Sequence, residues 1–64
     1  MTEKEKNKIR FQIAQIERTR PNLVWIDRVE NEQDGTQKVY GTARGFKIGC
    51  TVKDGRVDKI FAVF

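Results

Sequence analysis

One tryptophan, one tyrosine and a set of lysines and arginines are the residues of this sequence best suited to binding chemistry. The candidates are Trp25, Lys38, Tyr40, Arg44, Lys47, Lys53 and Arg56. Aromatic rings stack on nucleobases, at about 1–3 kcal/mol per base, and basic side chains neutralise phosphates. The net charge of +4, from 13 basic and 9 acidic residues, favours an anionic partner without specifying it. We therefore predict a surface that binds nucleic acid, with single strands preferred.

Patterns typical of catalysis and of metal binding are missing. The sequence has no histidine, no G-x-S-x-G motif and no phosphate-binding loop, so the usual nucleophilic constellations cannot form. Cys50, the single cysteine, could hold zinc only together with carboxylates, and its surroundings in 46–52 favour a small buried residue instead. Asp27 and Asp58 are expected to be charge partners of nearby cations. We predict a protein that is not an enzyme and uses no metal or cofactor.

The length and the cysteine content bound the class of protein. Sixty-four residues allow one domain, 1–64, near the lower limit for folding on a hydrophobic core alone, so a homodimer is a live alternative. One unpaired cysteine suits a reducing cytoplasm. No apolar stretch approaches the ~18 residues of a membrane span, and the first residues lack the apolar core of a signal peptide.

The segment before the single proline, Pro21, favours a helix over 2–18. Thr2 and Glu5 have the spacing of a capping box, in which each side chain bonds the backbone N–H of the other residue. Isoleucines then recur at helical spacing, at Ile9, Ile13 and Ile16. Arg18 complements the negative pole of such a helix, and Pro21 is a plausible stop.

A strand over 8–18 is the alternative for the same segment. Ile9, Phe11 and Ile13 also alternate with period two, and isoleucine favours strands slightly. A strand here would convert the domain into an all-β, five-stranded small barrel.

After Pro21 the sequence predicts four antiparallel strands, near 23–32, 36–43, 46–53 and 56–63. Asp34-Gly35 and Asp54-Gly55 are the dipeptides of two-residue hairpin turns, and Arg44-Gly45 is a third candidate turn. Short connections favour a meander. The expected fold class is therefore α+β, an N-terminal helix packed on a four-stranded antiparallel meander.

Three two-residue turns would also fix the register and the faces of the sheet. The expected pairs include Gln33–Thr36, Glu30–Val39, Ile26–Ala43, Ala43–Phe46, Gly41–Ile48, Val39–Cys50, Val52–Val57, Ile48–Phe61 and Phe46–Val63. The expected core face holds Val24, Ile26, Val39, Ala43, Phe46, Ile48, Cys50, Val52, Val57, Phe61 and Val63, interrupted by Arg28, Glu30 and Lys59. The opposite face would hold Leu23, Trp25, Asp27, Val29, Lys38, Tyr40, Thr42, Arg44, Lys47, Gly49, Thr51, Lys53, Arg56, Asp58, Ile60 and Ala62.

Other uses of that second face stay open. Trp25 and Tyr40 could fold over a sheet edge as a satellite of the core. The apolar residues among the set could instead form a self-association surface, because aromatic residues are enriched in interfaces. The alternative function is accordingly a regulator that binds a protein target, or a homodimer, through this face or through a free sheet edge.

Overall fold

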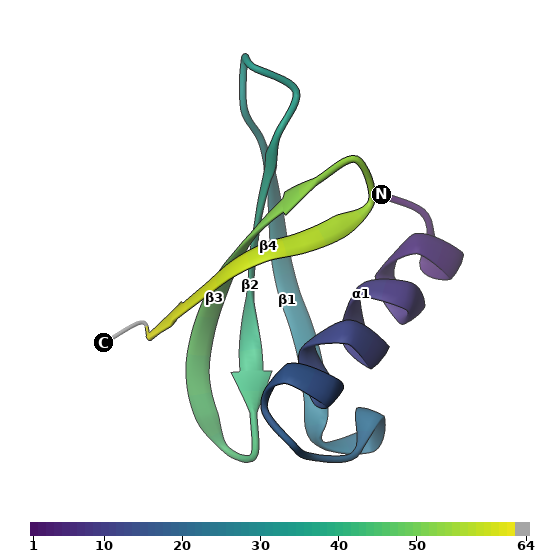
Figure 1. Cartoon of the computed structure of the whole chain (residues 1–64), viewed down its shortest axis with the longest axis vertical. Helices are drawn as coiled ribbons and strands as arrows, with labels where there is room; N and C mark the ends of the chain where they lie inside the picture. Colours follow the sequence, from purple (N-terminus) through teal and green to yellow (C-terminus); the bar gives the residue numbers. More distant parts are fainter. Residues whose placement is uncertain (63–64) are drawn as a thin grey trace.

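One helix packs on one face of a four-stranded antiparallel sheet in the computed structural model, which describes residues 1–62 and, for Ala62, the backbone only (Figure 1). The elements are α1 (Glu3–Ile16), the 3₁₀ turn η1 (Pro21–Leu23), β1 (Val24–Asn31), β2 (Gln37–Ala43), β3 (Phe46–Lys53) and β4 (Arg56–Ala62). The strands lie in the order β1-β2-β3-β4, and the sheet is open. The α+β meander is confirmed, and the five-stranded barrel is wrong because the N-terminal segment is helical.

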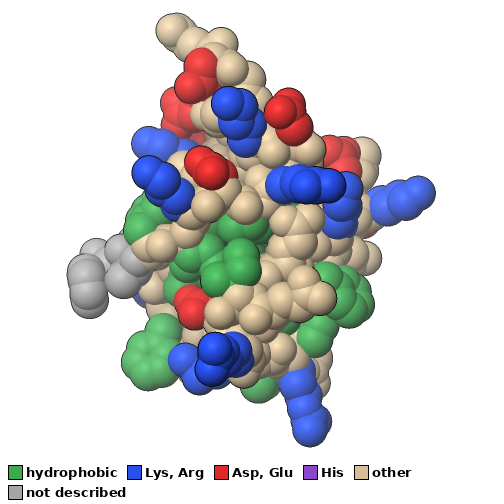
Figure 2. All heavy atoms as spheres, in the orientation of Figure 1, with side chains coloured by type: hydrophobic (Ala, Val, Ile, Leu, Met, Phe, Trp, Pro, Cys, Tyr) green, Lys and Arg blue, Asp and Glu red, His purple; other side chains and the backbone are tan. Residues whose placement is uncertain are grey.

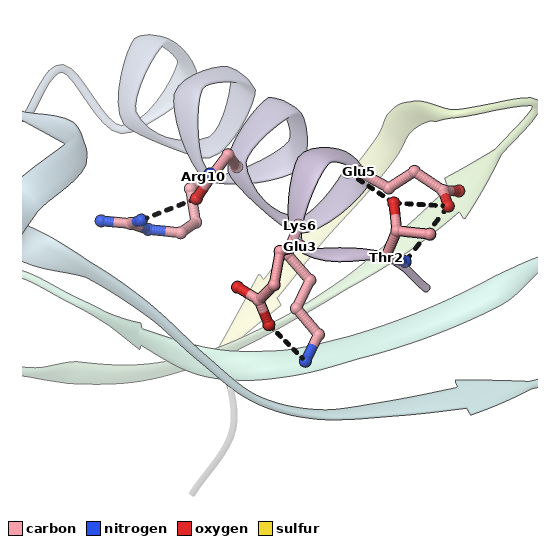
Figure 3. Close-up of polar contacts among 6 residues, drawn as sticks. Thr2, Glu3, Glu5, Lys6 and Arg10 are labelled. Carbon is pink, nitrogen blue, oxygen red and sulfur yellow. Dashed lines mark hydrogen bonds and ion pairs between the residues drawn. The ribbon is translucent and has the colours of Figure 1, made fainter.

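The first turn of α1 is fixed by the capping box that the sequence predicts. The Thr2 hydroxyl accepts a hydrogen bond from the Glu5 backbone N–H at 3.2 Å, and the Glu5 carboxylate accepts one from the Thr2 N–H at 3.1 Å (Figure 3). The bonds from the Thr2 backbone and then from its hydroxyl lower the pKa of the Glu5 carboxyl. Local sequence alone therefore sets where the helix begins.

The helix ends earlier than expected, and not at the proline. The Thr19 N–H donates to the Ala14 carbonyl at 2.8 Å, and the Arg18 N–H donates to the Gln15 carbonyl at 3.3 Å. These two bonds form a Schellman motif, with Arg18 in the left-handed conformation at φ 54°. Pro21 instead opens η1. No helix within residues 1–62 is long and apolar enough to cross a membrane.

Two polar side chains of α1 tie the helix to opposite edges of the sheet. Arg10 donates to the carbonyl of Val24 at 3.0 Å and to that of Pro21 at 2.9 Å. The Gln12 amide oxygen accepts from the N–H of Val57, at the start of β4, at 2.8 Å. Because these three bonds satisfy backbone groups at the two edge strands and in η1, they fix the orientation of α1 across the face that it covers.

The core lies between α1 and the sheet. Its buried residues are Ile9, Ile13, Ala14, Val24, Val39, Ala43, Ile48, Cys50 and Val52. Ile16, expected to join the helical stripe, is 54% exposed, because α1 ends at this residue and the chain turns away into η1. Phe46, also expected in the core, is 70% exposed beside the turn that precedes β3.

The first hairpin has a longer loop than expected. The Glu32 N–H donates to the Thr36 carbonyl at 2.9 Å, so 33–35 form a three-residue loop with Gly35 left-handed at φ 88°. The Asp34 carboxylate accepts from the Thr36 hydroxyl at 2.6 Å and from its N–H at 3.0 Å, which lowers the pKa of Asp34. This side-chain capping competes with the two-residue turn and shifts the register by one. Glu30 pairs with Lys38, not with Val39.

The other two turns form as predicted. Arg44-Gly45 and Asp54-Gly55 have positive φ at both positions, as type I′ turns require. The expected pairs are present beside them: Ala43–Phe46, Gly41–Ile48, Val39–Cys50 and Val52–Val57. The register of β2 with β3 is therefore confirmed along its whole length.

Each edge strand contains a β-bulge that the sequence expectations missed. In β1 the pairing shifts between Ile26 and Arg28, which leaves Asp27 as the extra residue. In β4 it shifts between Val57 and Lys59, which leaves Asp58 as the extra residue. The expected pairs Ile26–Ala43 and Ile48–Phe61 are therefore wrong. The expected pair Phe46–Val63, and Val63 as a core residue, lie outside the described residues.

The bulges exchange side chains between the two faces. Val29 and Ile60, expected on the exposed face, pack against the core. Arg28, Glu30, Lys59 and Phe61, expected on the core face, pair with residues of the exposed face. In β4 the bulge alone reverses the alternation of the side chains beyond it, whereas in β1 the longer loop shifts 28–31 by one residue and the bulge at Asp27 returns Val24 and Ile26 to the core face.

Gly41 is required by the close approach of β1 to β2, which gives a first prediction. A Cβ at Gly41 would overlap the carbonyl oxygen of Trp25, a backbone atom that cannot move aside. We expect Gly41→Ala to lower the free energy of unfolding by about 3 kcal/mol, measured by urea denaturation. Thr42→Ala, at the next residue, is the matched control and should cost less than about 1 kcal/mol. Equal stability of the two variants would contradict this packing.

The buried thiol predicts how stability depends on pH. Burial raises the pKa of Cys50 from an ordinary 9.0 to about 11. The unfolded chain therefore ionises this thiol at lower pH than the folded chain, so its stabilising contribution is complete below pH 9 and declines as the pH rises through 11. We expect a loss of roughly 2 kcal/mol over this interval, beyond that shown by Cys50→Ala. Parallel curves for the two proteins would contradict the prediction.

Candidate nucleic-acid interface

The face of the sheet away from α1 is uncovered and mainly basic. The register places on it Trp25, Arg28, Glu30, Lys38, Tyr40, Thr42, Lys47, Gly49, Thr51, Lys53, Arg56, Lys59 and Phe61, which we call the open face. This set contains six basic residues and one acidic residue. Six of the seven residues predicted as binding residues belong to it. Such a surplus attracts polyanions.

One row across the open face brings two aromatic rings and an arginine together. Arg28, Tyr40, Gly49 and Phe61 are paired in sequence from β1 to β4. The Phe61 ring lies over Gly49, where a Cβ would overlap it. Because nothing separates the rings there, Phe61 reaches Tyr40 with centroids 6.3 Å apart and planes at 80°, an edge-to-face contact. We call these four residues the central row.

Arg28 completes the central row by covering Tyr40. Its guanidinium carbon lies 4.4 Å from the centroid of the Tyr40 ring, a cation–π contact. It also pairs with Glu30 at 3.8 Å. The covered side of the Tyr40 ring is not open to a base, but guanidinium planes themselves stack on bases. The exposed stacking surfaces of the row are therefore Arg28 and the outer side of Phe61, which is 38% exposed.

Trp25 lies apart from the central row. It pairs with Thr42, one row further along, and is 61% exposed. It lines a hollow of 230 Å³ together with residues of α1, among them Lys6 and Arg10. The indole therefore stands at the β1 edge, where the open face meets the helix. It is not sealed in the core.

The basic residues of the open face divide into paired and unpaired groups. Lys38 forms an ion pair with Glu32 at 3.6 Å, as Arg28 does with Glu30. Four others have no ion pair with any residue that the structure describes: Lys47, Lys53, Arg56 and Lys59. All four are exposed and belong to β3 and β4. The cations available to a ligand thus lie on the half of the sheet that carries Phe61.

Arg44 is the one predicted binding residue that is not in a strand. It occupies the β2–β3 turn at φ 52°, and its N–H donates to the Leu23 carbonyl at 3.0 Å. It lines a 310 Å³ hollow at the end of the sheet together with Glu17 and Phe46. The sheet pairs Trp25 with Thr42, so the expected neighbourhood of Trp25 and Arg44 is displaced by two residues.

Acidic side chains are not confined to the other half of the sheet, because Asp54 and Asp58 line one hollow with Lys53 and Arg56. Figure 2 shows most of them toward the upper end of the molecule, where Figure 1 places the β1–β2 hairpin. That hairpin carries Glu30, Glu32 and Asp34. Acidic groups therefore accompany the cations at the end of β3 and the start of β4.

Four residues of the open face were missed by reasoning from the sequence: Arg28, Glu30, Lys59 and Phe61. A signal for them was present. The inward apolar residues run Val24, Ile26 and then Val29, and later Val57 and then Ile60. A step of three inside a strand indicates a bulge, because regular strands repeat every two residues.

Metal chemistry has no site in this part of the chain. No group of three or more histidine, cysteine or acidic side chains within residues 1–62 is arranged to hold a metal ion. Cys50 is buried in the core.

Comparison of the chain with family models, with curated proteins and with solved structures found no match. Function must therefore be inferred from the residues of the open face.

The central row predicts a proton NMR signature. The Gly49 Hα protons lie beneath the Phe61 ring, whose induced field should shift them upfield. We expect Phe61→Leu to return them to ordinary positions. Phe11→Leu is the control, since Phe11 is 60% exposed on the helix and should leave them unchanged. Ordinary Gly49 shifts in the unsubstituted protein would mean that the ring does not cover this glycine.

Proposed function

We propose that the protein binds single-stranded nucleic acid on its open face. Bases would stack on Phe61, on the Arg28 guanidinium and on Trp25, and phosphates would lie against the unpaired lysines and arginine of β3 and β4. No bond is made or broken in this function.

The central row is the observation that carries the proposal. An apolar ring exposed to water on a sheet face forgoes the favourable free energy of burial, yet Phe61 stays exposed among Lys47, Lys59 and Arg28. A nucleobase offers an apolar plane for the ring and brings the phosphate that the cations attract. An ordinary solvated face would satisfy the cations but gives no reason for the preassembled rings.

Pairing of a partner strand with a free sheet edge receives less support. Both edge strands are interrupted by a bulge, and the extra residue in each is an aspartate. Bulges and charges at an edge are the usual means of blocking strand addition. A protein ligand or a second copy would therefore have to use the open face itself.

Fluorescence anisotropy with labelled single-stranded oligonucleotides tests the proposal. If the four unpaired cations each displace one counterion, the logarithm of the association constant should fall against log salt with a slope of about −3. Duplexes of the same sequence should bind more weakly, because their stacked bases cannot reach the rings. Analytical ultracentrifugation of the free protein follows its oligomeric state.

Two matched pairs of variants distinguish binding at the open face from nonspecific attraction to the positive charge of the protein. Phe61→Leu should weaken binding about tenfold, since it removes a ring on which a base stacks. Phe11→Leu, which removes a ring from the helix, should leave binding unchanged. Lys47→Gln should weaken binding and reduce the salt slope by about 0.7, while Lys4→Gln on α1 leaves both nearly unchanged. Equal effects within each pair would contradict the proposal. So would a lack of binding at low salt, or a salt-insensitive dimer that buries the open face.

A further inference from the structure

Asp27 is a carboxylate inside the ligand-binding region proposed above that has no ion-pair partner among residues 1–62, unlike Glu30, which pairs with Arg28. As the extra residue of the β1 bulge, it lies between the row of Trp25 and the row of Arg28. It borders a 220 Å³ hollow whose other polar side chains are Arg28, Tyr40 and Lys47. Asp27 is exposed and forms no ion pair with residues 1–62.

An unpaired carboxylate in this position opposes phosphate binding. At 4 Å, two like charges repel by about 1 kcal/mol even in water. A surface selected only for the backbone of nucleic acid has no use for such a group. A carboxylate beside stacking surfaces does have a use in recognising the edge of a base, since it offers two adjacent acceptors and no donor.

Guanine is the base whose edge matches this arrangement. Its Watson–Crick edge presents two adjacent donors, N1–H and the N2 amino group, followed by the O6 acceptor. The Watson–Crick edges of adenine, of cytosine and of thymine or uracil each carry a single donor group, so none offers two neighbouring donors to a carboxylate. The Lys47 ammonium, on the opposite side of the hollow, supplies donors for O6.

We propose that the hollow between Asp27 and Lys47 binds guanine and gives the protein a preference for single strands that contain it. This inference rests on the proposed function. The guanine would stack on Arg28 or Trp25, which flank Asp27 on the same strand, with its Watson–Crick edge toward the carboxylate. Sequence-specific recognition of single strands commonly uses this combination of stacking and edge contacts.

Anisotropy titrations with three short oligonucleotides test the inference. They are an oligothymidylate, the same strand with one central guanosine, and the same strand with inosine there, which lacks the N2 amino group. We expect the guanosine strand to bind about tenfold more tightly than the oligothymidylate, and the inosine strand to lose most of that gain. Equal binding of all three would overturn the guanine site while leaving the proposed function intact. Absence of binding to any strand would overturn both.

Asp27→Asn supplies the second arm, with Asp58→Asn as its matched control. Both remove one charge from the extra residue of an edge-strand bulge. Asp27→Asn should abolish the difference between the guanosine and thymidine strands, and Asp58→Asn should keep it. If Asp27→Asn instead tightens binding to both strands by the same factor, the carboxylate only repels phosphate and the inference is wrong.

Discussion

A single helix is all that this fold has to cover its sheet, and this constraint decides the rest of the molecule. α1 supplies Ile9, Ile13 and Ala14 to one face, and the core is complete with six further residues from the strands. Arg10 and Gln12 hold the helix against both edges, so it cannot shift to the other side. The second face therefore stays in water.

The two bulges decide which residues that second face carries. Without them, alternation would turn Arg28 and Phe61 toward the core and Val29 and Ile60 toward solvent. One extra residue in each edge strand corrects both mismatches together. The hydrophobic residues are thereby buried, and Phe61 comes to lie over Gly49 against Tyr40. The central row is thus a consequence of satisfying the core.

The sequence predicts most of this fold where the signal is local. Thr2 and Glu5 suffice for the helix start, and the type I′ turn at Arg44-Gly45 suffices for the register of β2 with β3. The sequence predicts the fold less well where two local effects compete, as they do in the loop between β1 and β2. The carboxylate of Asp34 bonds Thr36 and lengthens a loop that the Asp-Gly dipeptide alone would shorten.

The candidate site was predicted in part for the same reason. Residues on β2 and β3, such as Tyr40 and Lys47, follow from a register without interruption. Arg28 and Phe61 lie beyond bulges, so a strictly alternating pattern assigns them to the wrong face. A bulge is favoured by packing across the whole sheet, and only the step of three between apolar residues marks it in the sequence.

The bulges lie in the edge strands, where they have two effects. They block the addition of another strand to the sheet, and they help to form the candidate site on the open face. An edge strand exposes unpaired N–H and C=O groups that invite another chain, and an extra aspartate at its centre interrupts that row. In β1 the same aspartate also stands beside Arg28, Tyr40 and Lys47 on the open face. In β4 Asp58 lies instead beside Lys53 and Arg56, near the turn and away from the rings. Blocking the edge explains both aspartates equally well, but only Asp27 has stacking surfaces on either side. Asp58 therefore has the general role of keeping the sheet edge free of other chains, whereas Asp27 has in addition the particular role of recognising a base.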